Sequence, residues 1–312
     1  MTGSSPAPRV SVVMCVYNGE RFLAEALGSI LGQSFGDLEL VIVDDGSSDG
    51  TPAILADVRD PRLRVATLPA NCGIATARNL GMAMARGEYV AVHDADDVAM
   101  PDRITAQVRF LDAHPEVHFL ASGFIKDDEG RRVMQRIVAD DAEIKARLLA
   151  LDGTAMIHTT TMMRGDFLRA NRLRYPARNT DVDHGLWIDA MAAGARFHRT
   201  DEVLVMFRRH GGNITAETSP WYPHHESGKT GLRARVLGLF HPDLSHVEAH
   251  AIARMLEWGA SLTIAEIGLG IAACEKLLRL GAPACGASAE LTQGLVRGAM
   301  ARRMAELARH LK

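Results

Sequence analysis

Apolar runs and helical repeats alternate along the first hundred residues of the chain. A near-continuous apolar run, Val10–Val16, is followed by a turn and by Glu20–Gln33, where apolar residues recur at helical spacing. A second apolar run, Leu38–Val43, precedes a helix that begins near Thr51, and a third run, Glu88–Val92, ends in a group of aspartates. This order predicts an α/β fold with a mostly parallel sheet covered by helices. Ligands of such a sheet gather at the carboxyl ends of its strands.

The aspartates after the third run indicate a site for a cation. Asp94, Asp96 and Asp97 follow one another closely at the end of this predicted strand. Carboxylate oxygens suit Mg²⁺ or Mn²⁺, and such a metal binds through one or two carboxylates while substrate phosphates supply other ligands. A nucleotide diphosphate is therefore the expected ligand. The alternative is a polar loop in which Asp97 or Asp102 caps the helix that Pro101 opens.

Six segments carry motifs at these predicted strand ends and further along the chain. They are Val12–Gly19, Val43–Thr51, Asn71–Asn79, Gly87–Asp97, Asp183–Trp187 and Phe207–Thr215. Together they resemble, in the same order, the motifs of the family 2 glycosyltransferases, including N-x-G-x-x-x-A-R-N and the G-E-Y strand that ends in D-x-D-D. The match covers roughly the first two-thirds of the chain, and six ordered motifs are far more specific than one. The resemblance implies the GT-A fold, a Rossmann-like sheet flanked by helices.

The resemblance also implies a binding site for a UDP-sugar donor. Its nucleotide-binding residues would be Val16, Tyr17, Asp45, Arg78, Asp94 and Ala95. Asp45 offers a carboxylate that accepts the ring N–H of uracil, and Tyr17 offers a face for base stacking. A half-buried aromatic that covers the sheet edge is the alternative for Tyr17. Arg78 is expected to reach phosphate or the acidic turn, with an ordinary surface arginine as the alternative.

The metal ligands implied by the resemblance are Asp96, Asp94 and His210, with Mn²⁺ or Mg²⁺ as the cofactor. An imidazole near a metal-bound diphosphate can ligate the ion or donate to a phosphate oxygen. The chain has 13 histidines, so His210 is distinguished by its position in the closing aromatic-R-x-H segment and not by its chemistry.

The catalytic base is marked less clearly, because Val182 stands where the family has a glutamate before its late aspartate. Spacing to Leu186 and Trp187 favours Asp183, and Asp181 is the competitor. A helix N-cap is the alternative role for either aspartate. The implied mechanism is direct displacement with inversion, in which the base takes the proton of an acceptor hydroxyl and a metal neutralises the leaving diphosphate.

Three classes of function are compatible with an acidic site on such a sheet. The leading one is a glycosyltransferase that acts on a glycan or lipid-linked acceptor in polysaccharide biosynthesis. A nucleotidyltransferase often has a glycine-rich and basic phosphate loop after the first strand, which Tyr17–Glu20 is not. A silent nucleotide-sugar-binding protein would be expected to lack a metal carboxylate or the base. The absence of G-x-G-x-x-G also disfavours a dinucleotide-binding domain.

Composition agrees with a globular enzyme. The 312 residues are 47% hydrophobic and 23% charged, with a formal net charge of −3 that gives no indication of nucleic-acid binding. We expect a nucleotide-sugar-binding catalytic domain over residues 1–215 and a linker with a helical extension over 216–312. No apolar segment approaches the roughly 20 residues that span a bilayer, and the N-terminus has no signal pattern, so a cytoplasmic location is expected. Four cysteines without metal-type spacing are expected to be reduced thiols.

The C-terminal part carries helical patterns but no chemical motif. Apolar residues recur at helical spacing through Val247–Leu280, and a weaker apolar stripe over Leu291–Leu311 lies beside basic residues. Packing on the catalytic domain is the simplest interpretation. A homodimer contact, or peripheral contact with the inner face of the membrane, is the alternative.

Overall fold

The computed structural model describes residues 7–151, 154–177, 181–213, 222–257 and 259–310. The chain forms two compact units. The first comprises Met1–Ala139, Met156–Val182 and Ala195–His210, and the second comprises Asp140–Ala155, Asp183–Gly194 and Gly211–Lys312. The domain boundary at residue 215 stays a prediction, and the compact units follow a different course, since two segments before it group with the C-terminal helices.

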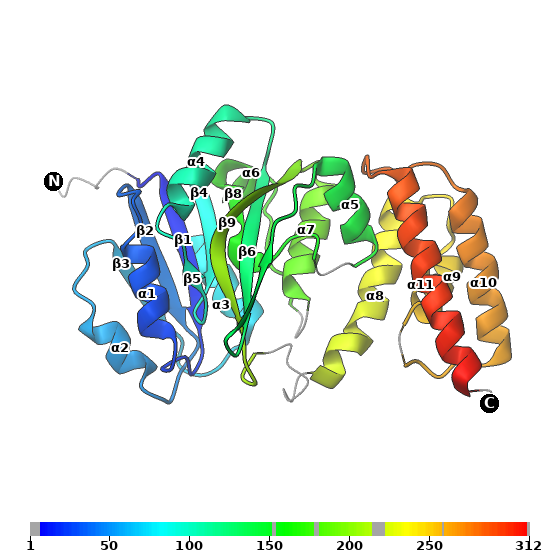
Figure 1. The fold of residues 1–312 in the computed structure, drawn as a ribbon, viewed down its shortest axis with the longest axis horizontal. Helices are drawn as coiled ribbons and strands as arrows, with labels where there is room; N and C mark the ends of the chain where they lie inside the picture. The colour runs from blue at the N-terminus through cyan, green and yellow to red at the C-terminus, as the bar shows by residue number, and fades with distance from the viewer. Residues whose placement is uncertain (1–6, 152–153, 178–180, 214–221, 258, 311–312) are drawn as a thin grey trace. The chain divides into compact units, whose positions relative to one another are not determined.

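A single sheet forms the centre of the first unit (Figure 1). Its order is β3-β2-β1-β4-β8-β6-β9-β5, with β7 paired to β6. The strands are β1 (Val10–Val16), β2 (Leu38–Asp44), β3 (Leu63–Thr67), β4 (Tyr89–Asp94), β5 (Val98–Ala99), β6 (Phe119–Asp128), β7 (Arg131–Gln135), β8 (Met162–Arg164) and β9 (Phe197–Arg209). The four strands from β3 to β4 are parallel, and β8 pairs antiparallel with both β4 and β6. The α/β fold with a mainly parallel sheet is confirmed.

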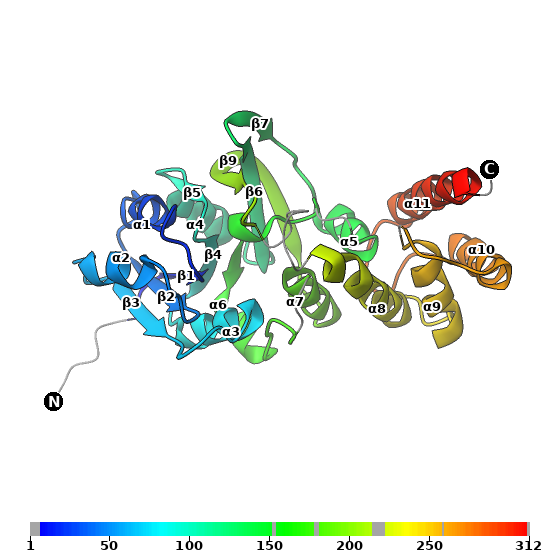
Figure 2. The ribbon, with the colours of Figure 1, turned by 90° about the horizontal axis from the view of Figure 1, so that it is seen from below.

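Helices cover both faces of the parallel strands. The helices of the first unit are α1 (Leu23–Leu31), α2 (Thr51–Asp57), α3 (Ile74–Met84), α4 (Arg103–Ala113), the 3₁₀ turn η1 (His158–Thr160) and α6 (Gly165–Ala170). Figure 2 shows α1 and α4 on one face and α3 on the other. Alternate residues of β1, such as Val12 and Met14, pack with α1 and α4, while Val13 faces Gly81 of α3. Burial on both faces explains why these strands are continuous apolar runs.

The register brings the carboxyl ends of three strands together. Val16 of β1 lies opposite Asp44 of β2, and Cys15 of β1 lies opposite Asp94 of β4. The turns that follow these strands therefore meet at one edge of the sheet, which is where a parallel sheet binds its ligands.

The second unit is helical. Its helices are α5 (Asp141–Leu149), α7 (Val182–Ala192), α8 (Tyr222–Phe240), α9 (His246–Met255), α10 (Ile264–Arg279) and α11 (Ala289–His310). The long apolar pattern of Val247–Leu280 folds as two helices, because Gly259 takes a positive φ of 74° and Thr263 begins α10 with a capping box. Of the linker expected after residue 215, residues 216–221 lie outside the described residues, and helix α8 begins at Tyr222.

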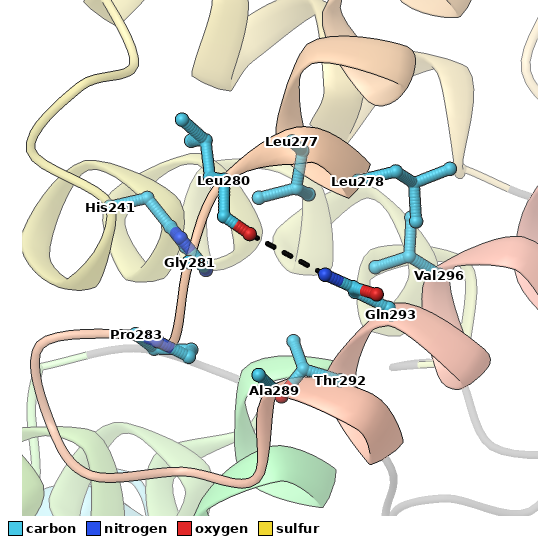
Figure 3. A pocket seen from close by; sticks show the side chains of 10 residues that line it. All are labelled: His241, Leu277, Leu278, Leu280, Gly281, Pro283, Ala289, Thr292, Gln293 and Val296. Carbon is cyan, nitrogen blue, oxygen red and sulfur yellow. Dashed lines mark hydrogen bonds between the residues drawn. The ribbon is translucent and has the colours of Figure 1, made fainter.

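Within its described residues, the chain has no helix that is both long and apolar enough to cross a membrane. The helices α8 to α11 share an apolar core that includes Leu237, Ile252, Leu277 and Val296. A small cavity at the ends of α10 and α11 has room for about one water molecule. Figure 3 shows its lining, mostly aliphatic side chains together with His241 and Gln293, whose amide donates to the carbonyl of Leu280. Burial lowers the pKa of His241, so this imidazole is neutral at physiological pH.

A buried carboxylate ties the amino ends of β1 and β2 to the segment before β4. Glu39 of β2 is 3% exposed and accepts hydrogen bonds from the Ser11 hydroxyl (2.6 Å) and from the Arg86 guanidinium (2.7 Å). Arg64 of β3 donates to the same carboxylate at 2.9 Å. Burial alone would raise the pKa of Glu39, but the hydrogen bonds from Arg86, Ser11 and Arg64 outweigh it and lower the pKa to about 2.

Replacing this carboxylate is expected to destabilise the protein in a pH-dependent way. Glu39→Gln should lower the free energy of unfolding by about 2 kcal/mol at pH 7, since charge-assisted hydrogen bonds are lost. Because the folded pKa lies below the unfolded one, the stabilisation is present above about pH 4.5 and is lost as the pH falls toward 2. Urea denaturation at several pH values measures the difference. Glu88→Gln, at an exposed ion pair with Arg9, is the control and should change little.

A difference in the free energy of unfolding between wild type and Glu39→Gln that stays constant from pH 7 to pH 2.5 would contradict the role assigned to Glu39.

Candidate active site

The turns after β1 and β2 are bound to each other. Asn18 takes a positive φ of 51°, and its side-chain oxygen accepts a hydrogen bond from the Ser48 backbone at 2.9 Å. Its own backbone N–H donates to the Ser47 hydroxyl, and that of Gly19 donates to the Thr51 hydroxyl, both at 2.9 Å. Asparagine tolerates this left-handed conformation better than most residues, which explains its use in the turn. The next residue toward β1, Tyr17, is 50% exposed.

Asp45 connects the second turn to the loop before α3. The side chain is buried, and its two oxygens accept hydrogen bonds from the backbone N–H groups of Cys72 (2.8 Å) and Gly73 (3.0 Å). Gly73 has a φ of 87°, which favours glycine at this position. Each carboxylate oxygen has a second lone pair, so Asp45 keeps the capacity to accept one more donor, such as a ring N–H.

Arg78 reaches the acidic turn at the end of β4. Its guanidinium donates to Asp94 Oδ1 at 3.1 Å and lies 3.2 Å from His158 Nδ1, which is itself 3.2 Å from Asp94 Oδ1. Burial would raise the pKa of Asp94, but the neighbouring His158 and Arg78 outweigh it and hold the pKa well below its usual range. Arg78 is 14% exposed. The interpretation of Arg78 as an ordinary surface arginine is therefore wrong.

The end of β9 is attached to the same acidic turn. His210 Nε2 lies 3.0 Å from Asp96 Oδ2, although the two residues are 114 positions apart. The Arg208 backbone N–H donates to Asp97 Oδ1 at 2.9 Å, and its guanidinium donates to the Asp96 carbonyl at 3.1 Å. Burial, together with the nearby charges of Asp96 and Asp94, raises the pKa of Asp97 well above its usual range. Asp97 thus binds β9, and Asp102, which is the N-cap residue of α4, makes no side-chain cap hydrogen bond.

These contacts place two pairs of side chains at one turn. Arg78 pairs with Asp94, and His210 pairs with Asp96. Val16 is the last residue of β1, and Ala95 lies in the turn itself. Among the residues that the structure describes, no three His, Cys, Asp or Glu side chains form a group that could hold a metal ion.

The two candidate bases lie at the start of α7. Asp181 precedes the helix in the N-cap position and has a positive φ of 52°. Asp183 lies in the first turn, its side chain is 30% exposed, and it accepts a hydrogen bond from the backbone N–H of His184. Asp183 belongs to the second compact unit and Asp181 to the first. Leu186 and Trp187 are fully buried, as expected for the apolar part of this motif.

A fully buried arginine contacts the end of β4, just before the acidic turn. Arg103 of α4 is 0% exposed and donates to His93 Nδ1 (2.9 Å), the Val92 carbonyl (2.8 Å) and Gln107 Oε1 (3.1 Å). Gln107 in turn donates to the carbonyl of Thr160. Burial lowers the pKa of Arg103 to about 10, so it remains charged at neutral pH. Burial and the Arg103 charge together lower the pKa of His93 to about 3, so this imidazole is neutral.

Three residues that contact Asp94 or its partner His158 were not predicted from the sequence. His158 contacts Asp94, Thr159 accepts a hydrogen bond from the Asp94 backbone at 3.2 Å, and the Tyr175 hydroxyl lies 2.9 Å from His158. They come from a part of the chain with neither a clear hydrophobic period nor one of the six motifs. The only available signal was the polar run His158–Thr161 next to apolar β8.

Comparison with known proteins identifies the family. The model of glycosyl transferase family 2 matches residues 11–172, more than half of the chain. The chain belongs to glycosyltransferase family 2. Two relatives and one solved structure show how far the similarity of this glycosyltransferase to known proteins extends. It is 33% identical over 212 residues to the putative glycosyltransferase EpsE of Bacillus subtilis, which covers 64% of this chain and 73% of EpsE.

It is also 31% identical over 250 residues to the succinoglycan biosynthesis protein ExoO of Rhizobium meliloti, which covers 76% of this chain and 65% of ExoO. Among solved structures, S. aureus TarS residues 1–349 in complex with UDP-GlcNAc superposes with a TM-score of 0.62 at 21% identity. That superposition covers 95% of this glycosyltransferase and 89% of the TarS chain, and it shows a shared fold.

The buried arginine behind the acidic turn should be essential for stability. Arg103→Met removes three hydrogen bonds and leaves buried acceptors unpaired, which should cost about 3 kcal/mol of unfolding free energy. Arg109→Met on the same helix is the matched control, because its side chain is 73% exposed and its change should stay within about 0.5 kcal/mol. Chemical denaturation at pH 7 compares them, and equal stability of the two variants would refute the assigned role of Arg103.

Proposed function

We propose that this family 2 glycosyltransferase transfers a sugar, with inversion, from a UDP-sugar to a hydroxyl group of a glycan or lipid-linked acceptor in a metal-dependent reaction. One observation carries the proposal. Asp96 and His210, from the ends of two distant strands, meet at 3.0 Å beside Asp94 at the carboxyl edge of the sheet. A carboxylate and an imidazole converge there, where the fold class binds a nucleotide.

The donor specificity is proposed from the chemistry of two residues. Asp45 retains lone pairs for the ring N–H of uracil, and the exposed ring of Tyr17 offers a stacking surface at the end of β1. Val16 and Ala95 would contribute backbone to the same site. The UDP-GlcNAc bound in the TarS structure supports a uridine nucleotide as donor, since the two chains share their fold.

The side chains of Asp96, His210 and Asp94 fit a hard cation that takes its other ligands from the nucleotide. Asp96 and His210 would hold Mn²⁺ or Mg²⁺, and Asp94 would assist from the start of the turn. Two or three protein ligands suffice where substrate phosphates supply the rest. When bound, the cation would neutralise the charge that develops on the leaving diphosphate. Arg78, which contacts Asp94, would add positive charge beside the phosphates.

Asp183 is proposed as the base that takes the proton from the acceptor hydroxyl, with Asp181 as the runner-up. Asp181 precedes α7 with a positive φ of 52°, whereas Asp183 lies within the first turn of the helix. One base is sufficient because a diphosphate held by a cation departs without protonation. Attack opposite the leaving group would invert the configuration.

The acceptor and the cellular setting are also part of the proposal. ExoO is a succinoglycan biosynthesis protein, which supports a role in polysaccharide biosynthesis. Residues 1–215 would form the catalytic domain of a cytoplasmic enzyme. Apolar side chains exposed on α10 and α11, such as Ile264, Leu269 and Met304, would serve a homodimer contact or peripheral contact with the inner face of the membrane.

Metal dependence can be tested by nucleotide binding alone. The wild-type protein should bind UDP more tightly with Mn²⁺ than with a chelator, as measured by titration calorimetry. Asp96→Asn should weaken the metal-dependent part by about tenfold or more while the melting temperature changes little. Asp128→Asn, on the exposed end of β6, serves as the control. Equal UDP affinity with metal and with chelator would exclude the proposed metal site.

The preference for uracil over cytosine is measured in the same titration. CDP should bind more weakly than UDP by about 1 to 3 kcal/mol, because cytosine lacks the ring N–H that Asp45 would accept. Equal binding of the two nucleotides would remove Asp45 from base recognition.

Separate substitutions distinguish the two candidate bases. Asp183→Asn should leave UDP-sugar affinity nearly unchanged and lower kcat by roughly 10²-fold or more, because a general base acts in the transition state. Asp181→Asn should cost much less. Transfer to an acceptor and donor binding are measured on the same preparations. The opposite ranking would assign the role to Asp181, and small effects from both would place the base elsewhere in the chain.

A further inference from the structure

Two buried side chains lie next to Arg78, and one of them also contacts Asp94. His158 of η1 is 7% exposed, and Tyr175, which follows α6, is 2% exposed. The Tyr175 hydroxyl lies 2.9 Å from His158 Nε2, and the opposite ring nitrogen, Nδ1, lies 3.2 Å from both Asp94 and Arg78. Hydroxyl, imidazole, guanidinium and carboxylate thus form one connected chain.

Helix α3 holds the tyrosine in place. The Asn79 side chain donates to the Tyr175 carbonyl and accepts from the Tyr175 backbone N–H, both at 2.8 Å. The Arg78 guanidinium lies over the Tyr175 ring, 5.5 Å from its centre. Neighbouring residues of one helix therefore contact the same tyrosine, one through the backbone and one through the ring.

This arrangement fixes the orientation of the imidazole. A hydroxyl can donate or accept, so Tyr175 satisfies Nε2 in either tautomer of His158. With Nε2 directed at Tyr175, Nδ1 must face Asp94 and Arg78. The Thr159 hydroxyl accepts from the Asp94 backbone, so adjacent residues of η1 hold both the backbone and the carboxylate of Asp94.

We propose that His158 and Tyr175 are positioning residues that hold Asp94 and Arg78 in the geometry required for the nucleotide diphosphate. The inference rests on the proposed function, since Asp94 and Arg78 are its nucleotide-binding residues. Neither His158 nor Tyr175 takes part in the chemistry. Their effect is on donor binding, because groups that orient a binding side chain change its affinity through that side chain.

The test compares UDP binding in the presence of Mn²⁺ for variants of the full chain. Tyr175→Phe keeps the ring beneath Arg78 and removes only the hydroxyl, so the Kd for UDP should rise by roughly two- to tenfold, the equivalent of one hydrogen bond. His158→Ala should raise it by about tenfold or more. With a UDP-sugar and an acceptor, KM for the donor should rise while kcat changes little.

A double variant separates positioning from general stability. If Tyr175 acts through His158, Tyr175→Phe should add no further loss in the His158→Ala background. Tyr89→Phe is the matched control, because Tyr89 is 1% exposed, lies on β4 with Asp94, and donates its hydroxyl to Asp112 at 2.7 Å. It should lower the melting temperature about as much as Tyr175→Phe and leave the Kd unchanged.

Three other results would overturn the proposed role of His158 and Tyr175. A Tyr175→Phe variant that binds UDP as tightly as wild type overturns the inference and leaves the proposed function intact. Additive losses in the double variant also overturn it, since they would show that Tyr175 acts without His158. A wild-type protein that binds no nucleoside diphosphate with metal overturns the proposed function and the inference together.

Discussion

Carboxylates at the carboxyl ends of β2 and β4, the two strands that flank β1, need compensating partners, because burial removes the water that would otherwise solvate them. Asp45 is compensated by two backbone N–H groups, Asp94 by a guanidinium and an imidazole, and Asp96 by His210. Asp97 accepts a hydrogen bond from the Arg208 backbone N–H, but burial and the charges of Asp96 and Asp94 outweigh it and raise its pKa. The acidic side chains of this edge therefore depend on backbone N–H groups and basic side chains from other parts of the chain.

The compensating groups come from segments far apart in the sequence. Arg103 supports the turn from α4, Arg78 reaches it from α3, and His158 approaches from η1, while β9 delivers Arg208 and His210. Each segment is also packed in the core of the first unit. The geometry of the acidic turn therefore depends on the correct folding of this unit. A substitution such as Arg103→Met should therefore affect stability first and nucleotide binding as a consequence.

Much of the parallel part of the sheet was predictable because its strands are buried on both faces and give unbroken apolar runs. The three-residue strand β8 gives no such run, and its antiparallel insertion between β4 and β6 depends on tertiary pairing. For the same reason His158 and Tyr175 could not be found, since their role exists only after β8 and α6 bring them to Arg78. Motif matching located Arg78 and Asp94, but the partners of these residues are set by packing and not by local sequence.

The division into compact units separates two kinds of side chain. Tyr17, Asp45, Arg78 and Asp94 all belong to the first unit, which has its own core, whereas Asp183 belongs to the helical one. In the proposed function, donor recognition would rest on the sheet edge of the first unit. Proton removal from the acceptor would rest on Asp183 of α7, whose buried Leu186 and Trp187 belong to the helical unit. Affinity for the nucleotide and turnover should consequently respond to different substitutions, which is what makes the two roles separable by experiment.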